Sequence, residues 1–493
     1  MRDVDPMKRR SSVNGKRRRV VLAFVLFVLP LPAAESKADR IDRLMQAYVD
    51  ARGFQGAVLV ADRGEVIFEK GYGLANVELN VPNTPGTKFR VGSLTKQFTA
   101  MLVLQLAAGG KLKLDARLSE YVSEYPAASG DRITIHHLLT HQSGIPNYTT
   151  PDFIAKRSRE FFRPVDLAKV FWDKPLDFEP GTQWRYSNSG YHVLGLVIER
   201  VTGKSYEQAL GERILEPLGM RDTGYDHTEV VLPRRAAGYT KTPDGLENAA
   251  LGDMSIPYSA GGMYSTVQDL WKWDRALYTE KLLSRKYLDV MFEPAAKLGE
   301  DRAYGYGWML SVWTLPGSKR QLRAIEHFGG INGFSSMIAR LPEDEGLIVA
   351  LANIFGVEWG GATRGIAQIL CGEPPEMPKK SLAGALGQRI RERGVTAAIE
   401  EFADSRDQYE VNQGELNSLG YHYLRAGKLK EAVEVFRLNV KAFPQSWRVY
   451  DSLGAALAAA GNREFALENY RKALELNPGA ESARKAIAEL ERQ

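Results

Sequence analysis

The sequence predicts an α+β domain, in which an antiparallel sheet carries a cluster of helices, followed by an all-α module of helical repeats. Three observations predict this order: β-hairpin patterns at both ends of residues 35–370, helical patterns between those hairpins, and a 34-residue repeat within residues 382–493. Residues 371–381 contain three prolines, which cannot continue a helix or a central strand. They are the predicted linker between the two parts.

Two β-hairpins are expected, one near each end of the first part. Residues 58–61 and 66–70 are short apolar or β-branched runs around a glycine-containing turn at residues 62–64. Residues 335–341 and 347–352 form a second pair around a proline-containing turn. Hairpins join antiparallel strands, so strands from both ends are expected to share one antiparallel sheet with helices packed on it.

The first 34 residues predict an export signal. They hold eight basic and two acidic side chains, so the formal charge of +5 becomes −1 without them. The basic stretch precedes the apolar run 20–31 and a small-residue exit, which is the order of a secretory signal peptide. That run is shorter than the roughly 20 apolar residues of a membrane-spanning helix, and we expect a cleaved signal in preference to an uncleaved anchor. The near-neutral product is expected to be periplasmic or secreted, with no stable membrane span and no electrostatic attraction to nucleic acid.

The second part carries a repeat with a period of 34 residues. Six positions recur in register: Leu419, Gly420, Gly427, Ala432, Phe436 and Pro444 return as Leu453, Gly454, Gly461, Ala466, Tyr470 and Pro478. This pattern is typical of tetratricopeptide-like repeats. Ala398 and Phe402 fit a degenerate earlier unit, and residues 479–493 are the expected closing helix. Two interpretations of the module stay open: a groove for a protein or peptide partner, and a helical extension that shields one face of the domain.

Ser93 and Lys96 stand at the start of a predicted buried helix. Residues 97–108 are apolar on almost every face and are followed by Gly109 and Gly110, which is typical of a buried helix that ends at a glycine. Serine and lysine three residues apart share one helix face. A serine hydroxyl becomes a good nucleophile when a nearby base takes its proton, and burial favours the neutral, proton-accepting form of lysine.

The spacing of Ser93 and Lys96 is not specific by itself. Ser482 and Lys485 have the same spacing on a helix that is expected to be solvated. The structural alternative is that Ser93 only caps the helix and that Lys96 is a surface residue of its first turn.

Two further motifs favour the catalytic interpretation. Tyr186 and Asn188 form the only Tyr-x-Asn of the chain, in a polar turn before a predicted helix at residues 193–201, and His327-Phe328-Gly329 precedes the second hairpin. In the order Ser-x-x-Lys, Tyr-x-Asn, His-x-Gly, the sequence resembles the active-site serine superfamily of penicillin-binding proteins and class C β-lactamases, with its carboxypeptidases and esterases. Residues 137–146 and 260–266 are similar to further stretches of that family. The resemblance implies a β-lactamase/transpeptidase-like fold for the first part.

The resemblance also implies a role for each motif residue. Ser93 would attack a carbonyl and form an acyl-enzyme, and Lys96 and Tyr186 would share the general-base work. Asn188 would orient either the substrate amide or Lys96. The backbone N–H groups of Ser93 and Gly330 would form the oxyanion hole.

The third motif departs from the family pattern at two positions. His327 stands where many relatives carry lysine, so activity is expected to change at roughly pH 6 to 7, where histidine titrates. Phe328 stands where β-lactamases and carboxypeptidases commonly carry a Thr or Ser hydroxyl near the substrate carboxylate. A phenyl ring offers no such donor, so neutral esters or amides gain over penicillins and D-Ala peptides. Gly329 and Gly330 complete the motif.

The sequence therefore predicts an exported serine hydrolase whose substrate is an ester, a D-amino-acid peptide or a β-lactam. No glutamate is placed by a motif to activate a deacylating water, so turnover is expected to use Tyr186, His327 or the substrate itself. The alternative is a penicillin-binding sensor or scaffold with little turnover, whose repeats bind a partner.

Metal and redox chemistry are not expected. The lone Cys371 excludes an intramolecular disulfide and any CxxC motif. His136, His137 and His141 have a spacing that could suit a metal, but no carboxylate follows them as in zinc proteases, and we expect no metal and no other cofactor. The absence of Gly-x-Ser-x-Gly disfavours an α/β-hydrolase.

Overall fold

The computed structural model describes residues 35–403 and 406–492. The predicted signal peptide, residues 1–34, lies outside the described residues. None of the described helices combines the length and the apolar character that crossing a membrane requires.

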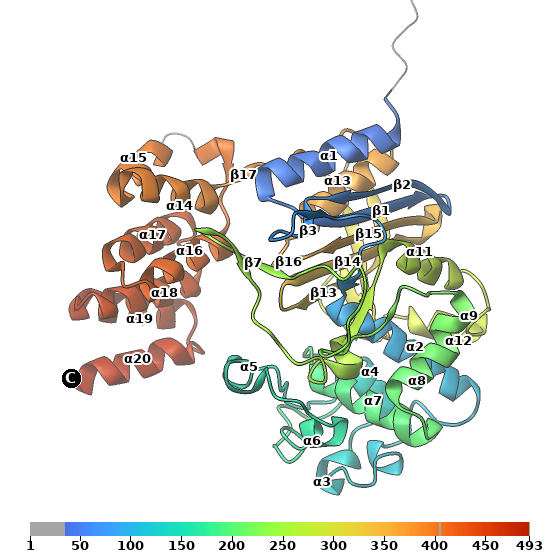
Figure 1. The fold of residues 1–493 in the computed structure, drawn as a ribbon. Helices are drawn as coiled ribbons and strands as arrows, with labels where there is room; N and C mark the ends of the chain where they lie inside the picture. Colours follow the sequence, from blue (N-terminus) through green and yellow to red (C-terminus); the bar gives the residue numbers. More distant parts are fainter. Residues whose placement is uncertain (1–34, 404–405, 493) are drawn as a thin grey trace, which may run out of the picture. The chain divides into compact units, whose positions relative to one another are not determined.

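An eight-stranded antiparallel sheet forms the centre of the first part (Figure 1). Its order is β10-β11-β12-β13-β14-β15-β1-β2, so the first strand of the domain pairs with β15 from its far end. The antiparallel sheet with packed helices that was predicted for the first part is confirmed, as are both predicted hairpins, β1–β2 and β14–β15. The strands are β1 Gly56–Asp62, β2 Glu65–Tyr72, β10 Ala296–Lys297, β11 Arg302–Tyr304, β12 Met309–Thr314, β13 Gln321–Ile331, β14 Phe334–Leu341 and β15 Gly346–Ala352.

The turn between β1 and β2 depends on backbone conformations that favour glycine. Arg63 and Gly64 have φ angles of 53° and 82°. Two consecutive residues with positive φ give the turn whose twist matches that of the two strands. Strand β1 thus returns directly into β2 at the edge of the sheet.

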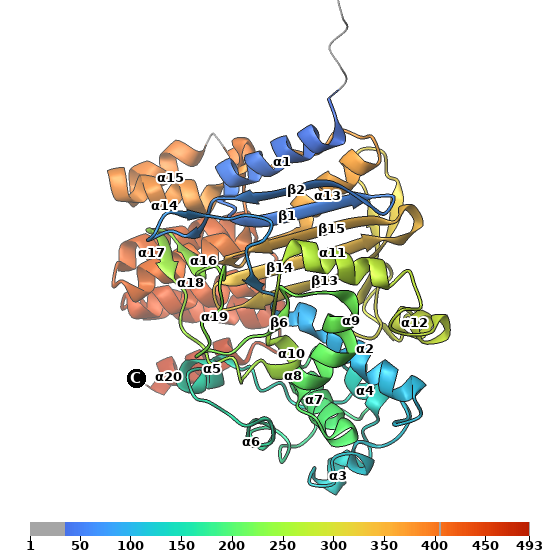
Figure 2. The same cartoon turned by 45° about the vertical axis from the view of Figure 1, so that its right-hand side comes forward.

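Helices cover both faces of this sheet (Figures 1 and 2). On one face, α1 (Lys37–Arg52) and α13 (Gly360–Leu370) pack against each other and enclose an apolar core with the sheet. On the other face, α11 (Val267–Ala276) packs on β1 and β15, and α2 (Thr95–Ala108) belongs to the same, larger core. Strands β14 and β15 are buried along their whole length because both of their faces are covered.

The helical cluster is built around α2 and α7 (Asn188–Thr202). Both predicted helices are present, but α7 begins at Asn188 rather than at residue 193, because the Ser187 side chain caps it by accepting from Gly190 N–H. The other helices of this part are α3 Ala127–Gly130, α4 Ile135–Leu139, α5 Pro151–Arg157, α6 Pro164–Ala168, α8 Tyr206–Leu210, α9 Glu216–Leu218, α10 Tyr258–Gly261 and α12 Arg285–Met291.

Short strands flank the main sheet. They are β3 Leu74–Asn76 with β4 Val81–Pro82, β5 Phe89–Arg90 and β6 Gly224–Tyr225 on either side of β9 Met263–Ser265, and β16 Ile354–Phe355 with β7 Tyr239–Thr242 and β8 Gly245–Asn248. The predicted linker holds no helix and one two-residue strand, β17 (Lys380–Ser381), which pairs with β18 (Tyr409–Glu410).

The C-terminal part is a helical module with a core of its own. Its helices are α14 Leu382–Arg393, α15 Val395–Ala403, α16 Gln413–Arg425, α17 Leu429–Ala442, α18 Trp447–Ala459, α19 Arg463–Leu476 and α20 Glu481–Arg492. Helix α14 packs on α15, and each helix from α16 to α20 packs on the next, which agrees with an array of paired helices. The assignment of these pairs to the tetratricopeptide family stays a prediction.

Glycines explain the 34-residue period in physical terms. A Cβ at Gly420 would lie 2.5 Å from the Phe436 ring, and a Cβ at Gly454 would lie 2.9 Å from the Tyr470 ring. The aromatic side chain of the second helix in each pair therefore packs directly on the backbone of the first.

Candidate active site

Ser93 lies where the sheet and the helical cluster meet. The chain leaves β5, forms the 3-10 turn η1 (Gly92–Leu94) and continues into α2. Gly92 has a φ of 49°, and a Cβ there would lie about 3 Å from the backbone of Gly330 on β13. Glycine at residue 92 therefore lets this turn lie directly against β13, and it leaves Ser93 partly exposed beside that strand.

Lys96 is fully buried one turn further along. Its Nζ lies 3.1 Å from Ser93 Oγ, 2.8 Å from Asn188 Oδ1 and 2.7 Å from the carbonyl oxygen of Ala260. Burial holds the pKa of Lys96 well below its usual range. The alternative in which Lys96 is a surface residue is wrong.

Tyr186 reaches Ser93 from a distant segment. Its hydroxyl donates a hydrogen bond of 2.7 Å to Ser93 Oγ. Burial raises the pKa of this phenol, and the hydrogen bond to Ser93 offsets part of the rise. Ser93 Oγ therefore lies between an amine that has lost much of its basicity and a phenol that keeps its proton.

Asn188 is the first residue of α7 and fixes Lys96. Its Oδ1 accepts from Lys96, its Nδ2 donates to Thr149 Oγ1 at 3.1 Å, and its backbone N–H donates to Asn147 Oδ1 at 3.1 Å. Asn188 also lines the pocket at Ser93, so the two roles expected for it, orienting the substrate amide or Lys96, stay predictions.

His327 on β13 differs from its expected behaviour. It is only 3% exposed, with Nδ1 2.7 Å from the Phe328 carbonyl and Nε2 3.0 Å from the Tyr304 hydroxyl. Burial, with a smaller effect of the Lys96 charge, lowers the pKa of His327 to about 3. The expected titration at roughly pH 6 to 7 is therefore wrong, because burial disfavours the charged imidazolium and keeps the ring neutral.

The other three residues of the third motif lie in different surroundings. Gly329 faces inward, where a Cβ would lie 2.0 Å from the Val91 carbonyl oxygen, and Gly330 lines the pocket at Ser93. Phe328 is 37% exposed and is not among the residues that line the pocket.

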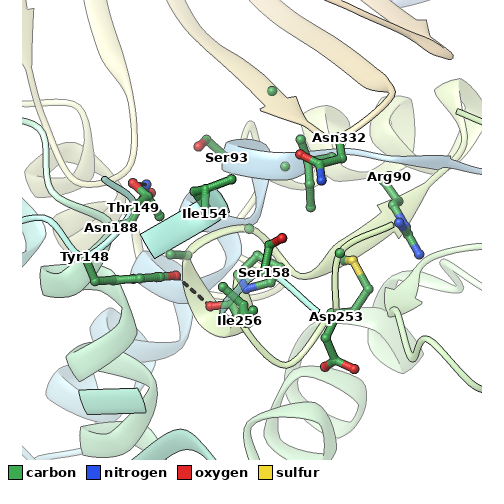
Figure 3. A pocket seen from close by; sticks show the side chains of 18 of the residues that line it. Arg90, Ser93, Tyr148, Thr149, Ile154, Ser158, Asn188, Asp253, Ile256 and Asn332 are labelled. Carbon is green, nitrogen blue, oxygen red and sulfur yellow. Dashed lines mark hydrogen bonds between the residues drawn. The ribbon is translucent and has the colours of Figure 1, made fainter. Parts of the chain in front are cut away.

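Ser93 opens into a pocket of about 360 Å³ (Figure 3). Its walls are mainly apolar, with side chains from Ile154, Met254, Ile256, Pro257, Ile331 and Phe355. Two charged residues, Arg90 and Asp253, also line it, and Arg90 Nε donates to Asp226 Oδ2 at 2.6 Å. Ser93 and Asn188 line the pocket, whereas Lys96, Tyr186 and His327 do not.

Residues 41–370 match the family model described as Beta-lactamase. The chain belongs to the beta-lactamase family. It is 32% identical over 304 residues to PbpX of Bacillus subtilis (strain 168), a protein whose name places it with the penicillin-binding proteins. That match covers 61% of this chain and 73% of PbpX.

Two solved structures share the fold of this beta-lactamase family member. A penicillin-binding protein from Bacillus halodurans has 28% sequence identity and a TM-score of 0.58, over 66% of this chain and 98% of that one. A D-amino acid amidase from Ochrobactrum anthropi SV3 has 26% identity and a TM-score of 0.58, over 68% of this chain and 98% of that one.

Several contacts of this beta-lactamase-family site were not predicted. Ala260, whose carbonyl oxygen accepts from Lys96, lies in residues 260–266, which resemble a stretch of the family, so the sequence did mark this segment. Thr149 and Tyr304, the partners of Asn188 and His327, carry no local signal, because their roles depend on contacts across the fold.

The three histidines with metal-like spacing have separate partners. His136 Nδ1 lies 2.8 Å from the Tyr306 hydroxyl, His137 Nδ1 accepts from Thr134 N–H, and His141 Nδ1 accepts from Ser187 N–H. Within residues 35–403 and 406–492, no three His, Cys, Asp or Glu side chains are grouped so that they could hold a metal ion.

Proposed function

We propose that this protein is an exported serine hydrolase that forms an acyl-enzyme on Ser93 and hydrolyses an ester or an amide. The observation that carries the proposal is the position of Ser93 Oγ, 3.1 Å from Lys96 Nζ and 2.7 Å from the Tyr186 hydroxyl, at an apolar pocket. Export rests on the pattern of residues 1–34.

The lowered pKa of Lys96 supports its role as the base. A neutral amine has two N–H groups and one lone pair. Asn188 Oδ1 and the Ala260 carbonyl oxygen can only accept, so they take the two N–H groups. The lone pair then faces Ser93 Oγ and can receive the hydroxyl proton as Oγ attacks the substrate carbonyl.

Tyr186 completes the transfer. Its phenol gives a proton to the leaving group as the C–O or C–N bond breaks, and the proton that Lys96 holds restores the phenol. The backbone N–H groups of Ser93 and Gly330 stabilise the negative oxygen formed at the carbonyl. In deacylation, water loses a proton to the same pair as its oxygen joins the acyl carbon. The bond between that carbon and Ser93 Oγ then breaks, the acid leaves, and Oγ takes the proton back from the pair.

The pocket supports an apolar acyl group without a carboxylate. The walls around Ser93 are mainly aliphatic or aromatic, and this lining carries the proposal, because Phe328 does not line the pocket. The related amidase was solved with D-phenylalanine, which has an aromatic side chain. We therefore expect neutral esters and D-amino-acid amides to be better substrates than β-lactams and D-Ala peptides.

A substrate panel with Ser93→Ala as its partner tests this function. The panel contains p-nitrophenyl esters, D-phenylalanine amide, a D-Ala-D-Ala peptide and a cephalosporin. We expect repeated turnover of the esters or the amide, with kcat lower by at least about 10³-fold in Ser93→Ala. Turnover that survives in Ser93→Ala would contradict the proposal.

The second candidate is a penicillin-binding sensor that acylates with little turnover. A C-terminal helical module with its own core, which could bind a protein partner, favours it. A fluorescent penicillin separates the two functions. A stable label on Ser93 without turnover of any substrate indicates the sensor, whereas absence of both label and turnover indicates a scaffold.

A further inference from the structure

His141 is buried beside Tyr186, and the mechanism above does not use it. We propose that His141 is a positioning residue, which holds the segment of Tyr186 so that its phenol meets Ser93. This inference rests on the proposed function and adds a residue to the machinery of the same site.

The backbone of His141 already contacts the Tyr186 segment. His141 follows α4 with a φ of 60°, the left-handed conformation in which helices often end and which favours glycine or asparagine. In this conformation its carbonyl oxygen accepts a 3.0 Å hydrogen bond from Arg185 N–H.

The imidazole binds the other side of the same segment. His141 Nδ1 accepts a 3.1 Å hydrogen bond from Ser187 N–H. Its ring lies against the phenol, with ring centroids 4.4 Å apart and an angle of 37° between the planes. The two neighbours of Tyr186 are therefore both bonded to His141, and its ring packs on Tyr186 itself.

Hydrogen bonding, burial and packing fix the tautomer, the charge state and the position of the His141 imidazole. Because Nδ1 accepts, the ring proton is assigned to Nε2, which has no hydrogen-bond partner among the described residues. Burial, followed by the charge of Lys96, holds the pKa of His141 well below its usual range, so the ring stays neutral. The rings of Tyr191 and Tyr304, with centroids 5.0 Å and 4.7 Å away, pack on it as well.

The consequence concerns proton transfer to the leaving group. A shift of about 1 Å in a catalytic group can cost about 10²-fold in rate. If His141 acts through Tyr186, its loss should slow the reaction most for substrates whose leaving group has a high pKa, because such a leaving group most needs a proton.

Two variants separate the ring from the backbone conformation. His141→Gly and His141→Asn both tolerate the left-handed φ, but only asparagine retains an acceptor, Oδ1, for Ser187 N–H. With aryl esters of graded leaving-group pKa, we expect kcat of His141→Gly to fall about 10²-fold with KM within about threefold. The rate should also depend more steeply on the leaving group, as in Tyr186→Phe. His141→Asn should recover most of the rate.

The controls decide whether the effect passes through Tyr186. His137→Asn, in the same segment, should leave kcat unchanged. His141→Gly combined with Tyr186→Phe should be no slower than Tyr186→Phe alone. A crystal structure of His141→Gly should show the 2.7 Å distance from the Tyr186 hydroxyl to Ser93 Oγ lengthened.

The inference is overturned if the effects of His141→Gly and Tyr186→Phe on kcat multiply in the double variant. It is also overturned if His141→Gly leaves the dependence of the rate on leaving-group pKa unchanged, or if Tyr186 does not move in its crystal structure. Failure of the proposed function has a different signature. The unmodified protein would then turn over no substrate, or Ser93→Ala would remain active, and the crystal structure of His141→Gly would still decide the role of His141.

Discussion

Burial decides which groups near Ser93 carry charge. Lys96, Tyr186 and His327 would be charged, neutral and partly charged in water near pH 7. In the folded chain, burial lowers the pKa of Lys96 and His327 and raises that of Tyr186. Neutral forms are thereby favoured for all three, which suits a site that moves a proton from Ser93 to a leaving group.

The pH dependence of the reaction follows from these pKa directions. As the proposed base, Lys96 must be neutral, so kcat/KM should rise with pH through the lowered pKa of Lys96. His327, with a pKa of about 3, keeps one charge state across neutral pH and should add no inflection. We therefore expect His327→Gln to leave the midpoint of the kcat/KM profile where it is in the unmodified protein. A midpoint that disappears or moves in this variant would show that His327 titrates.

At the scale of elements, the contact between β13 and η1, the turn before α2, determines which backbone groups lie beside Ser93. Gly92 on η1 and Gly329 on β13 both lie so close to opposing backbone that a side chain has no room. The Ser336 hydroxyl donates to the Val91 carbonyl oxygen at 2.7 Å and ties β14 to the same turn. This close approach brings the backbone of Gly330 beside Ser93, where the oxyanion hole is proposed.

Adjacent glycines of β13 should respond differently to alanine. A Cβ at Gly329 would lie 2.0 Å from the Val91 carbonyl oxygen, so Gly329→Ala must push β13 away from η1. We expect kcat/KM to fall about 10²-fold or more, as when an oxyanion donor is lost. Gly330→Ala keeps its N–H and meets only Phe355, at 3.4 Å, so its loss should be smaller. Steady-state kinetics, with a thermal unfolding curve for each variant, measure both. Equal activities would contradict the close approach of η1 and β13.

At the scale of the molecule, the described chain has separate apolar cores. Two lie on the faces of the main sheet and contain no residue of the helical module, and the third lies wholly within α14–α20 and the segments between them. Polar contacts join the module to the domain, including Arg52 with Glu415 at 2.6 Å and His422 with Asp244 at 3.0 Å. Such contacts contribute little to stability where they are solvated.

Removal of the helical module should therefore leave the catalytic domain active. No residue that lines the pocket at Ser93 comes from the module. A chain that ends at residue 379 should keep kcat for a p-nitrophenyl ester within about threefold of the full chain, because contacts to the transition state are retained. Kinetics on both chains, with circular dichroism to check folding, measure this. A folded truncated chain with no activity would assign the module a part in the site.

Much of the fold was predictable because its signals are local. Alternating and β-branched runs around tight turns indicated β1, β2, β14 and β15, and glycines with rings at a 34-residue spacing indicated the paired helices. Strands β10, β11, β12 and β13 were not predicted. Of these, β10 and β11 span only two or three residues, which carry no periodicity. The order of the three motifs was also predictable, because it is a property of the sequence and does not depend on tertiary contacts.

The sequence by itself determined which residues could form the site: Ser93, Lys96, Tyr186, Asn188 and the stretch from His327. Tertiary structure decided which of them meet and which charge state each favours, because approach and burial depend on segments far apart in the chain. Packing kept His327 neutral where its residue type predicts a titration near neutrality, and it placed His141, part of an apparent metal motif, beside Tyr186. Local patterns specify which elements form, whereas pKa values and proton paths depend on what the folded chain places around each group.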